Sequence, residues 1–174
     1  DTGTNPLAAD SDGDGLSDGE ELVPGGTGES PEQAISLGRL APGLLSVDTA
    51  GSAVGDTELG LYAASGDLLA NNYDSPLGLQ SVVEGNLPAG TYYLATGAWN
   101  TGFGLAGFDV TAPSGVANSL TVNVRLGAFD AASAIVATAT GANEAGAVWF
   151  TAVVGTSYDP NVDDSDSDFD ADGA

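Results

Sequence analysis

Between residues 34 and 154 the chain consists of short apolar runs that alternate with turn-forming residues. Ten of these runs are predicted to be β-strands, because each is rich in residues that favour β-structure and is bounded by Gly, Pro, Asn or Asp. The predicted strands cover residues 34–38, 43–48, 57–63, 67–71, 79–85, 90–98, 107–112, 119–126, 134–140 and 147–154. Many short strands with evenly spaced turns favour an all-β fold, namely an antiparallel β-sandwich or jelly roll.

Two of the predicted strands alternate clearly between apolar and other side chains. In residues 120–126 the apolar side chains take every second position and alternate with Thr121, Asn123 and Arg125. Residues 148–154 repeat this alternation. A period of two with one apolar face predicts half-buried strands.

Local turn signals suggest how some of the strands are connected. The Asn-Glu-Ala-Gly sequence at 143–146 separates the last two predicted strands and favours a terminal hairpin. Helical periodicity is weak, and residues 20–23 and 31–34 are each expected to form a single turn at most. Residues 102–107 match Gly-x-Gly-x-x-Gly, but a dinucleotide site needs a helix after this motif, whereas a strand is expected here. These glycines are therefore interpreted as loop residues.

The most specific motif of the chain is Asp-Ser-Asp-Gly-Asp-Gly-Leu-Ser-Asp-Gly-Glu-Glu at residues 10–21. It has the spacing of an EF-hand calcium loop, including the glycine at the sharp turn and the acid at the bidentate position. The predicted ligands are Asp10, Asp12, Asp14, the backbone carbonyl of Leu16, Asp18 and Glu21. Because carboxylates this close repel one another without a counter-ion, the loop favours Ca²⁺, a hard cation that prefers oxygen ligands. The alternative is a solvated acidic linker without metal.

A second acidic segment at residues 164–173 is an incomplete copy of this loop. With Gly173 at the turn, Asp168, Asp170 and Asp172 take the first three ligand positions, and the sequence stops before the remaining ones. The candidate calcium ligands of this segment are Asp164, Asp166, Asp168, Asp170 and Asp172.

Placed tail to head, the second acidic segment leads through Gly-Thr-Asn-Pro-Leu at residues 3–7 into the complete loop. This arrangement resembles the thrombospondin type 3-like calcium repeats of secreted bacterial proteins, over residues 1–22 and 159–174. The resemblance implies that both segments bind Ca²⁺. It leaves two interpretations open. In the first, the chain is a repeating unit of a linear assembly with calcium-filled joints. In the second, it is a fragment of a multidomain protein that carries a clipped linker repeat at each end.

The acidic residues are concentrated in the same two regions. The formal net charge is −23, and 14 of the 25 acidic residues lie within residues 1–21 and 159–172. With no Lys and only two Arg there is no basic patch, so binding to nucleic acid or to an anionic membrane surface is not expected. No apolar run is long enough for a membrane span, and no Cys is present to form a disulfide. Calcium loops of this kind suit extracellular calcium, which predicts a secreted or surface-displayed protein.

A second resemblance rests on motifs inside the predicted sandwich. Residues 56–74 contain Asp-Thr-x-Leu-x-Leu-Tyr, Ser-Gly and Asn-Asn-x-Asp, and residues 87–95 begin with Leu-Pro-Ala-Gly-Thr-Tyr-Tyr. Over residues 30–112 the chain resembles the bacterial pre-peptidase C-terminal domain, a small β-sandwich attached to exported proteins. The resemblance implies an accessory role in secretion, folding or surface contact, and it brings no catalytic residues.

Two further groups of residues are candidate sites within the sandwich. Asp56, Glu58 and Asp74 are candidates for a weaker calcium site, although acids at strand ends more often bond to nearby backbone amides. A sugar-binding face is a second possibility, although aromatic residues more often pack in a core. The candidates for this face are Tyr62, Tyr73, Tyr93, Trp99 and Trp149.

Catalysis is poorly supported, because the chain has no His, Cys or Lys to act as a base, thiol nucleophile or Schiff-base amine. We therefore expect a non-enzymatic structural module in three parts: residues 1–29 and 157–174 bind calcium, and residues 30–156 form the sandwich. Its partner is expected to be a further copy, either in a homopolymer joined head to tail or as a tandem repeat. The alternative is an accessory domain of a larger secreted hydrolase that binds carbohydrate or a surface.

Overall fold

The computed structural model describes residues 26–75, 78–113, 119–144 and 146–155. The calcium ligands predicted within residues 10–21 and 164–172 lie outside these ranges, and so does the turn predicted at 20–23.

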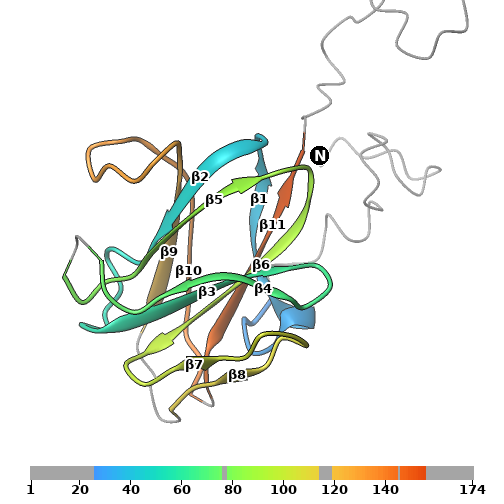
Figure 1. Cartoon of the computed structure of the whole chain (residues 1–174). Coiled ribbons are helices and arrows are strands. Elements are labelled where there is room, and N and C mark those ends of the chain that lie inside the picture. Colours follow the sequence, from blue (N-terminus) through green and yellow to red (C-terminus); the bar gives the residue numbers. More distant parts are fainter. Residues whose placement is uncertain (1–25, 76–77, 114–118, 145, 156–174) are drawn as a thin grey trace, which may run out of the picture. The chain divides into compact units, whose positions relative to one another are not determined.

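The described residues form two β-sheets that face each other, which confirms the predicted all-β sandwich (Figure 1). In spatial order, the first sheet contains β1 (Ile35–Leu40), β11 (Val148–Val154), β6 (Gly90–Ala98), β3 (Thr57–Ala63) and β4 (Leu68–Asn72). The second sheet contains β10 (Ile135–Gly141), β9 (Leu120–Leu126), β2 (Gly43–Asp48) and β5 (Val82–Leu87). A short hairpin of β7 (Gly102–Phe103) and β8 (Val110–Thr111) and a 3-10 turn, η1 (Pro31–Gln33), complete the described structure.

Most predicted strands coincide with observed ones, and three of them, β2, β3 and β6, agree at both ends. The strand predicted at 79–85 begins instead at Val82, because Ser81 belongs to a buried cluster of hydroxyl groups. Its backbone amide donates to Oγ1 of Thr49 (2.9 Å) and of Thr57 (3.2 Å). The strand predicted at 107–112 contains only β8, and β7 was not predicted.

The predicted terminal hairpin is wrong, because β10 and β11 belong to different sheets. β10 pairs with β9, whereas β11 lies between β1 and β6. The chain crosses from one sheet to the other at residues 142–147, where the buried side chain of Asn143 donates a hydrogen bond to the Ala147 carbonyl (2.7 Å). The turn sequence was recognised correctly, but it bends a connection between the sheets.

The main hydrophobic core lies between the two sheets. It collects the inward side chains of both, among them Leu45, Val47, Leu59, Leu61, Val83, Leu94, Leu120, Val122, Val124, Val148, Phe150 and Val154. Full burial of one such side chain contributes about 1.5–3 kcal/mol to the free energy of folding. The predicted alternation holds here for Leu120, Val122 and Val124, whereas Leu126 lies at the end of β9 and is 54% exposed.

A second apolar cluster covers the outer face of the first sheet. Tyr62, Ala95, Ala147 and Trp149 are buried there beneath the segment that contains the β7–β8 hairpin. Phe103 of this hairpin lies close above Gly60, where a Cβ atom would be 2.6 Å from the phenylalanine Cδ1. The central strands of the first sheet are therefore buried on both faces.

Two residues predicted on a polar face of β9 are buried instead. Asn123 and Arg125 are only 5% and 6% exposed. Both interact with Asp48 of the neighbouring strand β2, which is fully buried: Nε of Arg125 lies 2.8 Å from Oδ2, and Nδ2 of Asn123 donates to Oδ1 (2.9 Å). Arg125 also donates to the carbonyls of Ala131 and Ser133, which ties the β9–β10 loop to the sheet.

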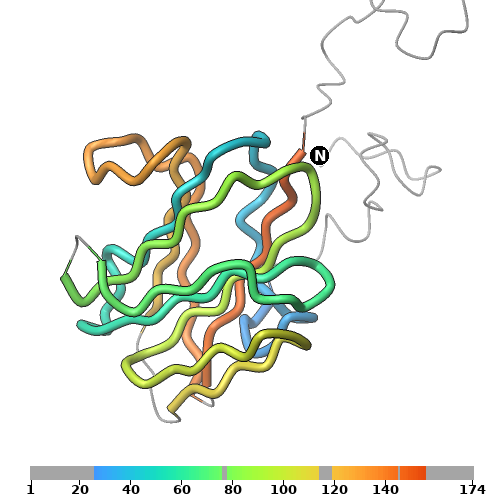
Figure 2. Tube along the Cα trace, in the orientation of Figure 1, coloured from blue at the N-terminus to red at the C-terminus, as the bar shows by residue number. Residues whose placement is uncertain are grey.

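The path of the chain through the first sheet places its two described ends apart. β1 and β11 are parallel, while the other neighbouring strands of the two sheets are antiparallel. Ahead of β1, the Gly28 carbonyl accepts a hydrogen bond from the Trp149 amide (2.9 Å), and after β11 the Gly155 amide donates to the Leu40 carbonyl (3.0 Å). The two described ends of the sandwich therefore lie at opposite ends of β11 (Figure 2). A strand of seven residues places these ends about 20 Å apart.

Candidate functional site

The predicted second calcium site on the sandwich does not form as a cluster of carboxylates. Within the described ranges no three acidic side chains come together to hold a metal ion, so Asp56, Glu58 and Asp74 do not make such a group. Glu58 instead bonds to a backbone amide, which is the alternative role expected for acids at strand ends.

Glu58 is buried, with 5% exposure, on the outer side of β3. Its Oε1 accepts a hydrogen bond from the amide of Asn100 (3.0 Å), while its buried Oε2 has no hydrogen-bond partner. Burial raises the pKa of Glu58, and the nearby negative charges of Asp56 and Asp74 raise it further, while backbone hydrogen bonds from Asn100 and Thr101 act in the opposite direction. The carboxyl group is therefore held at this place against an electrostatic cost.

The turn after β6, residues 98–101, is held by Glu58 and by several further hydrogen bonds. The Trp99 amide donates to the Asp56 carbonyl (3.1 Å), and the Thr101 amide and hydroxyl both donate to the Ala98 carbonyl (3.2 and 2.7 Å). Thr101 is buried and folds back over Gly97, at a place that a Cβ atom at residue 97 would occupy. This closely bonded turn carries Trp99, whose side chain is 68% exposed.

The five aromatic residues proposed as a sugar-binding face do not share one surface. Tyr62 and Trp149 are buried in the second apolar cluster, and Tyr93 packs against that cluster. Only Tyr73, which is 48% exposed, and Trp99 present large parts of their side chains to solvent. Packing of aromatic residues in a core, which is the more common arrangement, therefore holds for three of the five residues.

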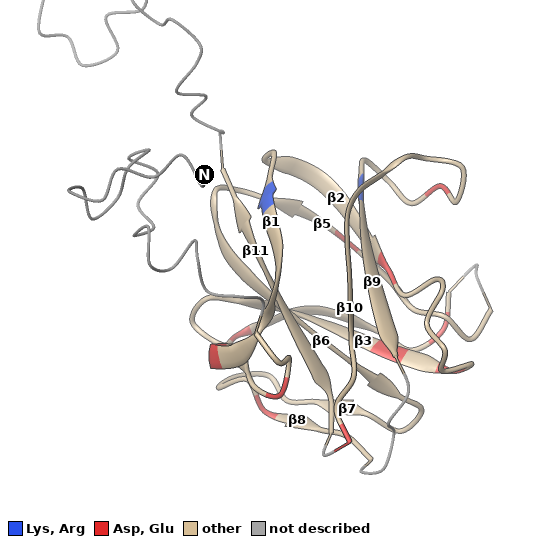
Figure 3. Cartoon of the chain, turned by 180° about the vertical axis from the view of Figure 1, so that it is seen from behind, with Lys and Arg blue, Asp and Glu red and all other residues tan. Residues whose placement is uncertain are grey.

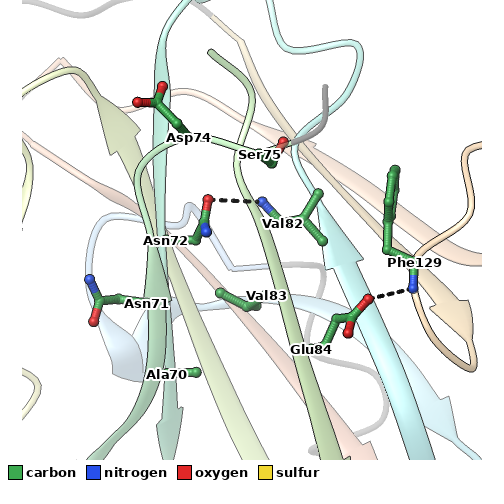
Figure 4. A pocket seen from close by; sticks show the side chains of 9 residues that line it. All are labelled: Ala70, Asn71, Asn72, Asp74, Ser75, Val82, Val83, Glu84 and Phe129. Carbon is green, nitrogen blue, oxygen red and sulfur yellow. Dashed lines mark hydrogen bonds between the residues drawn. The ribbon is translucent and has the colours of Figure 1, made fainter. Parts of the chain in front are cut away.

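An open groove lies between β4 and β5, the edge strands of the two sheets (Figure 4). It has a volume of about 440 Å³. Its polar lining comes from Asn71, Asn72, Asp74, Ser75 and Glu84, and Phe129 lies at one side. The groove brings residues of both sheets together, and the sequence did not indicate it.

Two hydrogen bonds join the walls of this groove (Figure 4). Oδ1 of Asn72 on β4 accepts from the Val82 amide (3.5 Å), and Oε1 of Glu84 on β5 accepts from the Phe129 amide (2.5 Å). The Arg125 guanidinium lies 5.8 Å from the centre of the Phe129 ring and holds the same loop. The lining residues supply amide, hydroxyl and carboxylate groups, so the groove suits binding of a polar ligand.

The groove continues into a more apolar recess of about 330 Å³, with which it shares Ala70 and Glu84. Leu69 and Leu87 line this part, on β4 and β5 respectively. Two backbone carbonyls at the end of β4, those of Asn72 and Tyr73, already accept hydrogen bonds from Ser81 Oγ (3.0 and 3.3 Å).

The two arginines of the chain lie on different sheets. Arg39 is on β1, at the opposite edge of the first sheet from β4, and Arg125 is paired with Asp48 in the second sheet (Figure 3). In the part of the chain that the structure describes, no helix has the length and apolar character needed to cross a bilayer.

Comparison with known proteins yields no family for this chain. No family model matches it, and no curated protein or solved structure matches it significantly. The resemblances to thrombospondin type 3-like repeats and to the pre-peptidase C-terminal domain rest on the sequence motifs alone.

Proposed function

We propose that this chain is a calcium-stabilised structural module of an extracellular filament or surface polymer, in which successive units are joined head to tail. The observation that carries this proposal is the parallel pairing of β1 with β11. As a result, the two described ends of the sandwich lie at opposite ends of the same strand. Sandwiches with this chain path can follow one another in line without the chain turning back across a sheet.

Calcium has a mechanical role in this proposal. The loop at residues 10–21 and the incomplete loop at 164–173 bring many carboxylates together, and Ca²⁺ neutralises their mutual repulsion. Bound metal restricts segments that would otherwise gain conformational entropy by unfolding, and so it fixes the joint between units. The incomplete loop of one unit is completed by residues at the start of the next.

Electron microscopy of the native material in millimolar calcium, and again after excess chelator, tests this proposal. Ordered filaments that separate or lose their regular spacing on chelation are the expected result. A denaturing gel of the same material distinguishes separate molecules from tandem copies in one polypeptide. Monodisperse single particles in both conditions would contradict the assembly.

A second candidate function is a non-catalytic binding domain of a larger secreted hydrolase. The polar groove between β4 and β5 favours it, because an open recess with amide and carboxylate groups suits a ligand rich in hydroxyl groups. This function requires no self-association, so absence of filaments together with binding to a polymeric substrate would favour it over the structural module.

A further inference from the structure

We propose that one end of the first sheet, made by Asp56, Tyr73, Asp74 and Trp99 and here called the aromatic end, binds a saccharide chain that carries no negative charge. This inference concerns a ligand site and does not depend on the head-to-tail assembly. The aromatic end is distinct from the groove of Figure 4, although Asp74 borders both.

Two aromatic side chains of the aromatic end are exposed. Trp99 and Tyr73 are the most exposed aromatic residues of the described chain, with 68% and 48% of their surface accessible. Exposed apolar residues are common singly, but an exposed Trp beside an exposed Tyr offers two flat surfaces on which sugar rings can stack.

The strand register sets the spacing of the two aromatic residues. β3 lies between β6 and β4, with Thr57 paired to Ala98 and Leu59 paired to Asn72. Trp99 follows Ala98, and Tyr73 follows Asn72, so the two aromatic residues are separated by two strand spacings and two residues along the strands. Their Cα atoms are therefore about 12 Å apart, a separation that a short saccharide chain can span.

Both aromatic residues are held in place by contacts with neighbouring residues. Trp99 belongs to the turn fixed by Glu58 and Thr101, and the Tyr73 ring lies 6.2 Å from the ring of Phe103, which packs over Gly60. A preformed surface loses little conformational entropy on binding, which favours affinity. Glu58 holds this turn through Oε1. This role explains why Glu58 is buried here, although its Oε2 has no hydrogen-bond partner.

The aromatic end carries acidic side chains. Its carboxylates belong to Asp56 and Asp74, and the arginines lie on β1 and β9 (Figure 3). Carboxylates accept strong hydrogen bonds from hydroxyl groups and repel anions, so neutral or amine-bearing sugars fit and acidic sugars do not. A protein interface is less well matched, because its centre is usually depleted in charged residues, whereas here carboxylates accompany the aromatic rings.

Tryptophan fluorescence of the full chain in excess calcium tests the proposal, because the chain has two Trp residues and Trp149 is buried. The probes are the neutral hexasaccharides of glucose, mannose and N-acetylglucosamine, the amine-bearing glucosamine hexamer, and an oligogalacturonate as the anionic probe. We expect at least one uncharged or amine-bearing probe to change the Trp99 emission in a saturable way, and the oligogalacturonate to have no effect.

Variants assign the binding to individual residues. Trp99→Ala and Tyr73→Ala should each weaken binding, measured by calorimetry, by roughly tenfold, the scale of a residue central to an interface. Leu105→Ala is the control, because Leu105 is 82% exposed and lies outside the aromatic end. Circular dichroism checks that each variant is folded.

Three results would overturn the proposal. They are the absence of any emission change with all neutral and amine-bearing probes, binding that Trp99→Ala and Tyr73→Ala leave unchanged, and binding of the oligogalacturonate in preference to the others. A lysine-rich peptide that alters Trp99 emission while no saccharide does so would assign the surface to a basic protein partner instead.

Discussion

At the scale of single residues, the pair of Asp48 and Arg125 is the most consequential interaction in the described structure. Asp48 is fully buried and the guanidinium is 2.8 Å from it. Loss of the arginine would leave an isolated buried carboxylate, which is far more costly than loss of the pair. The same arginine holds the β9–β10 loop, so its removal also affects one wall of the groove.

We therefore predict that Arg125→Met lowers the free energy of unfolding by about 3–5 kcal/mol. The double variant Asp48→Asn/Arg125→Met should recover part of this loss, because a neutral amide at residue 48 no longer needs a cation. Urea unfolding of the single and double variants measures the coupling between the two sites. Equal losses in Arg125→Met and in the double variant would contradict a role for the buried charge.

Glu58 provides a prediction about pH. Its pKa in the folded protein is raised above its ordinary value of 4.5, mainly by burial. Folding therefore favours the protonated form, and the stability associated with this group is present below pH 4.5 and is lost as the pH rises through the higher folded-state pKa.

Glu58→Gln keeps an oxygen that can accept from the Asn100 amide and removes the charge. We expect the variant to be at least as stable as the native protein at pH 7, and its advantage to shrink near pH 4. Urea unfolding at the two pH values checks this. If Glu58→Gln lowers the free energy of unfolding, relative to the native protein, more at pH 7 than at pH 4, the ionised carboxylate is required.

At the scale of elements, the β7–β8 hairpin decides how the first sheet is buried. Phe103 of this hairpin packs above Gly60, so a side chain at residue 60 would displace it. We predict that Gly60→Ala lowers the free energy of unfolding by about 1–3 kcal/mol, because the added methyl group overfills the contact. Gly55→Ala is the matched control, with open space around its Cβ position and an expected change within about 0.5 kcal/mol. Thermal unfolding of both variants makes the comparison, and equal effects would contradict the packing argument.

The positions of the elements were largely predictable, but their partners were not. The positions of strands such as β2, β3 and β6 can be predicted from local alternation and turn residues, because both signals involve residues that are neighbours in the sequence. The separation of β10 and β11 into two sheets depends on contacts between residues distant in sequence, such as Thr138 with Asn123 and Phe150 with Leu94. A turn signal shows where the chain bends and does not show which strand it pairs with next.

At the scale of the whole molecule, calcium is expected to act on the acidic segments and not on the sandwich core. The core consists of apolar side chains from two sheets, and we expect its burial not to require neutralisation of the acidic residues of 10–21 or 164–172. We predict that excess chelator leaves most of the β-sheet circular dichroism intact while the joints between units loosen. Loss of all β-sheet signal at the onset of chelation would contradict this.

The calcium loop itself can be tested by Asp10→Ala, which removes the first predicted ligand. We expect calcium binding by this loop to weaken by at least roughly tenfold in a calorimetric titration. Glu144→Gln, which changes an exposed acid in the sandwich, is the control and should leave the titration unchanged. If the two variants behave alike, the acidic loop at 10–21 is a solvated linker and not a metal site.

The sequence by itself determined the all-β class, the position of most strands and the calcium-loop motif, because each depends on the order of neighbouring residues. The tertiary structure alone decided which polar and aromatic side chains are accessible. Arg125 and Asn123 are buried because Asp48 lies on the adjacent strand, and Tyr62 and Trp149 are buried because the segment containing the β7–β8 hairpin covers the outer face of the first sheet. Trp99 remains exposed because its turn, at the end of that sheet, is fixed by hydrogen bonds that the Trp99 and Asn100 amides donate to the Asp56 carbonyl and to Glu58. These outcomes depend on contacts between distant parts of the chain, which a local pattern of hydrophobicity does not contain.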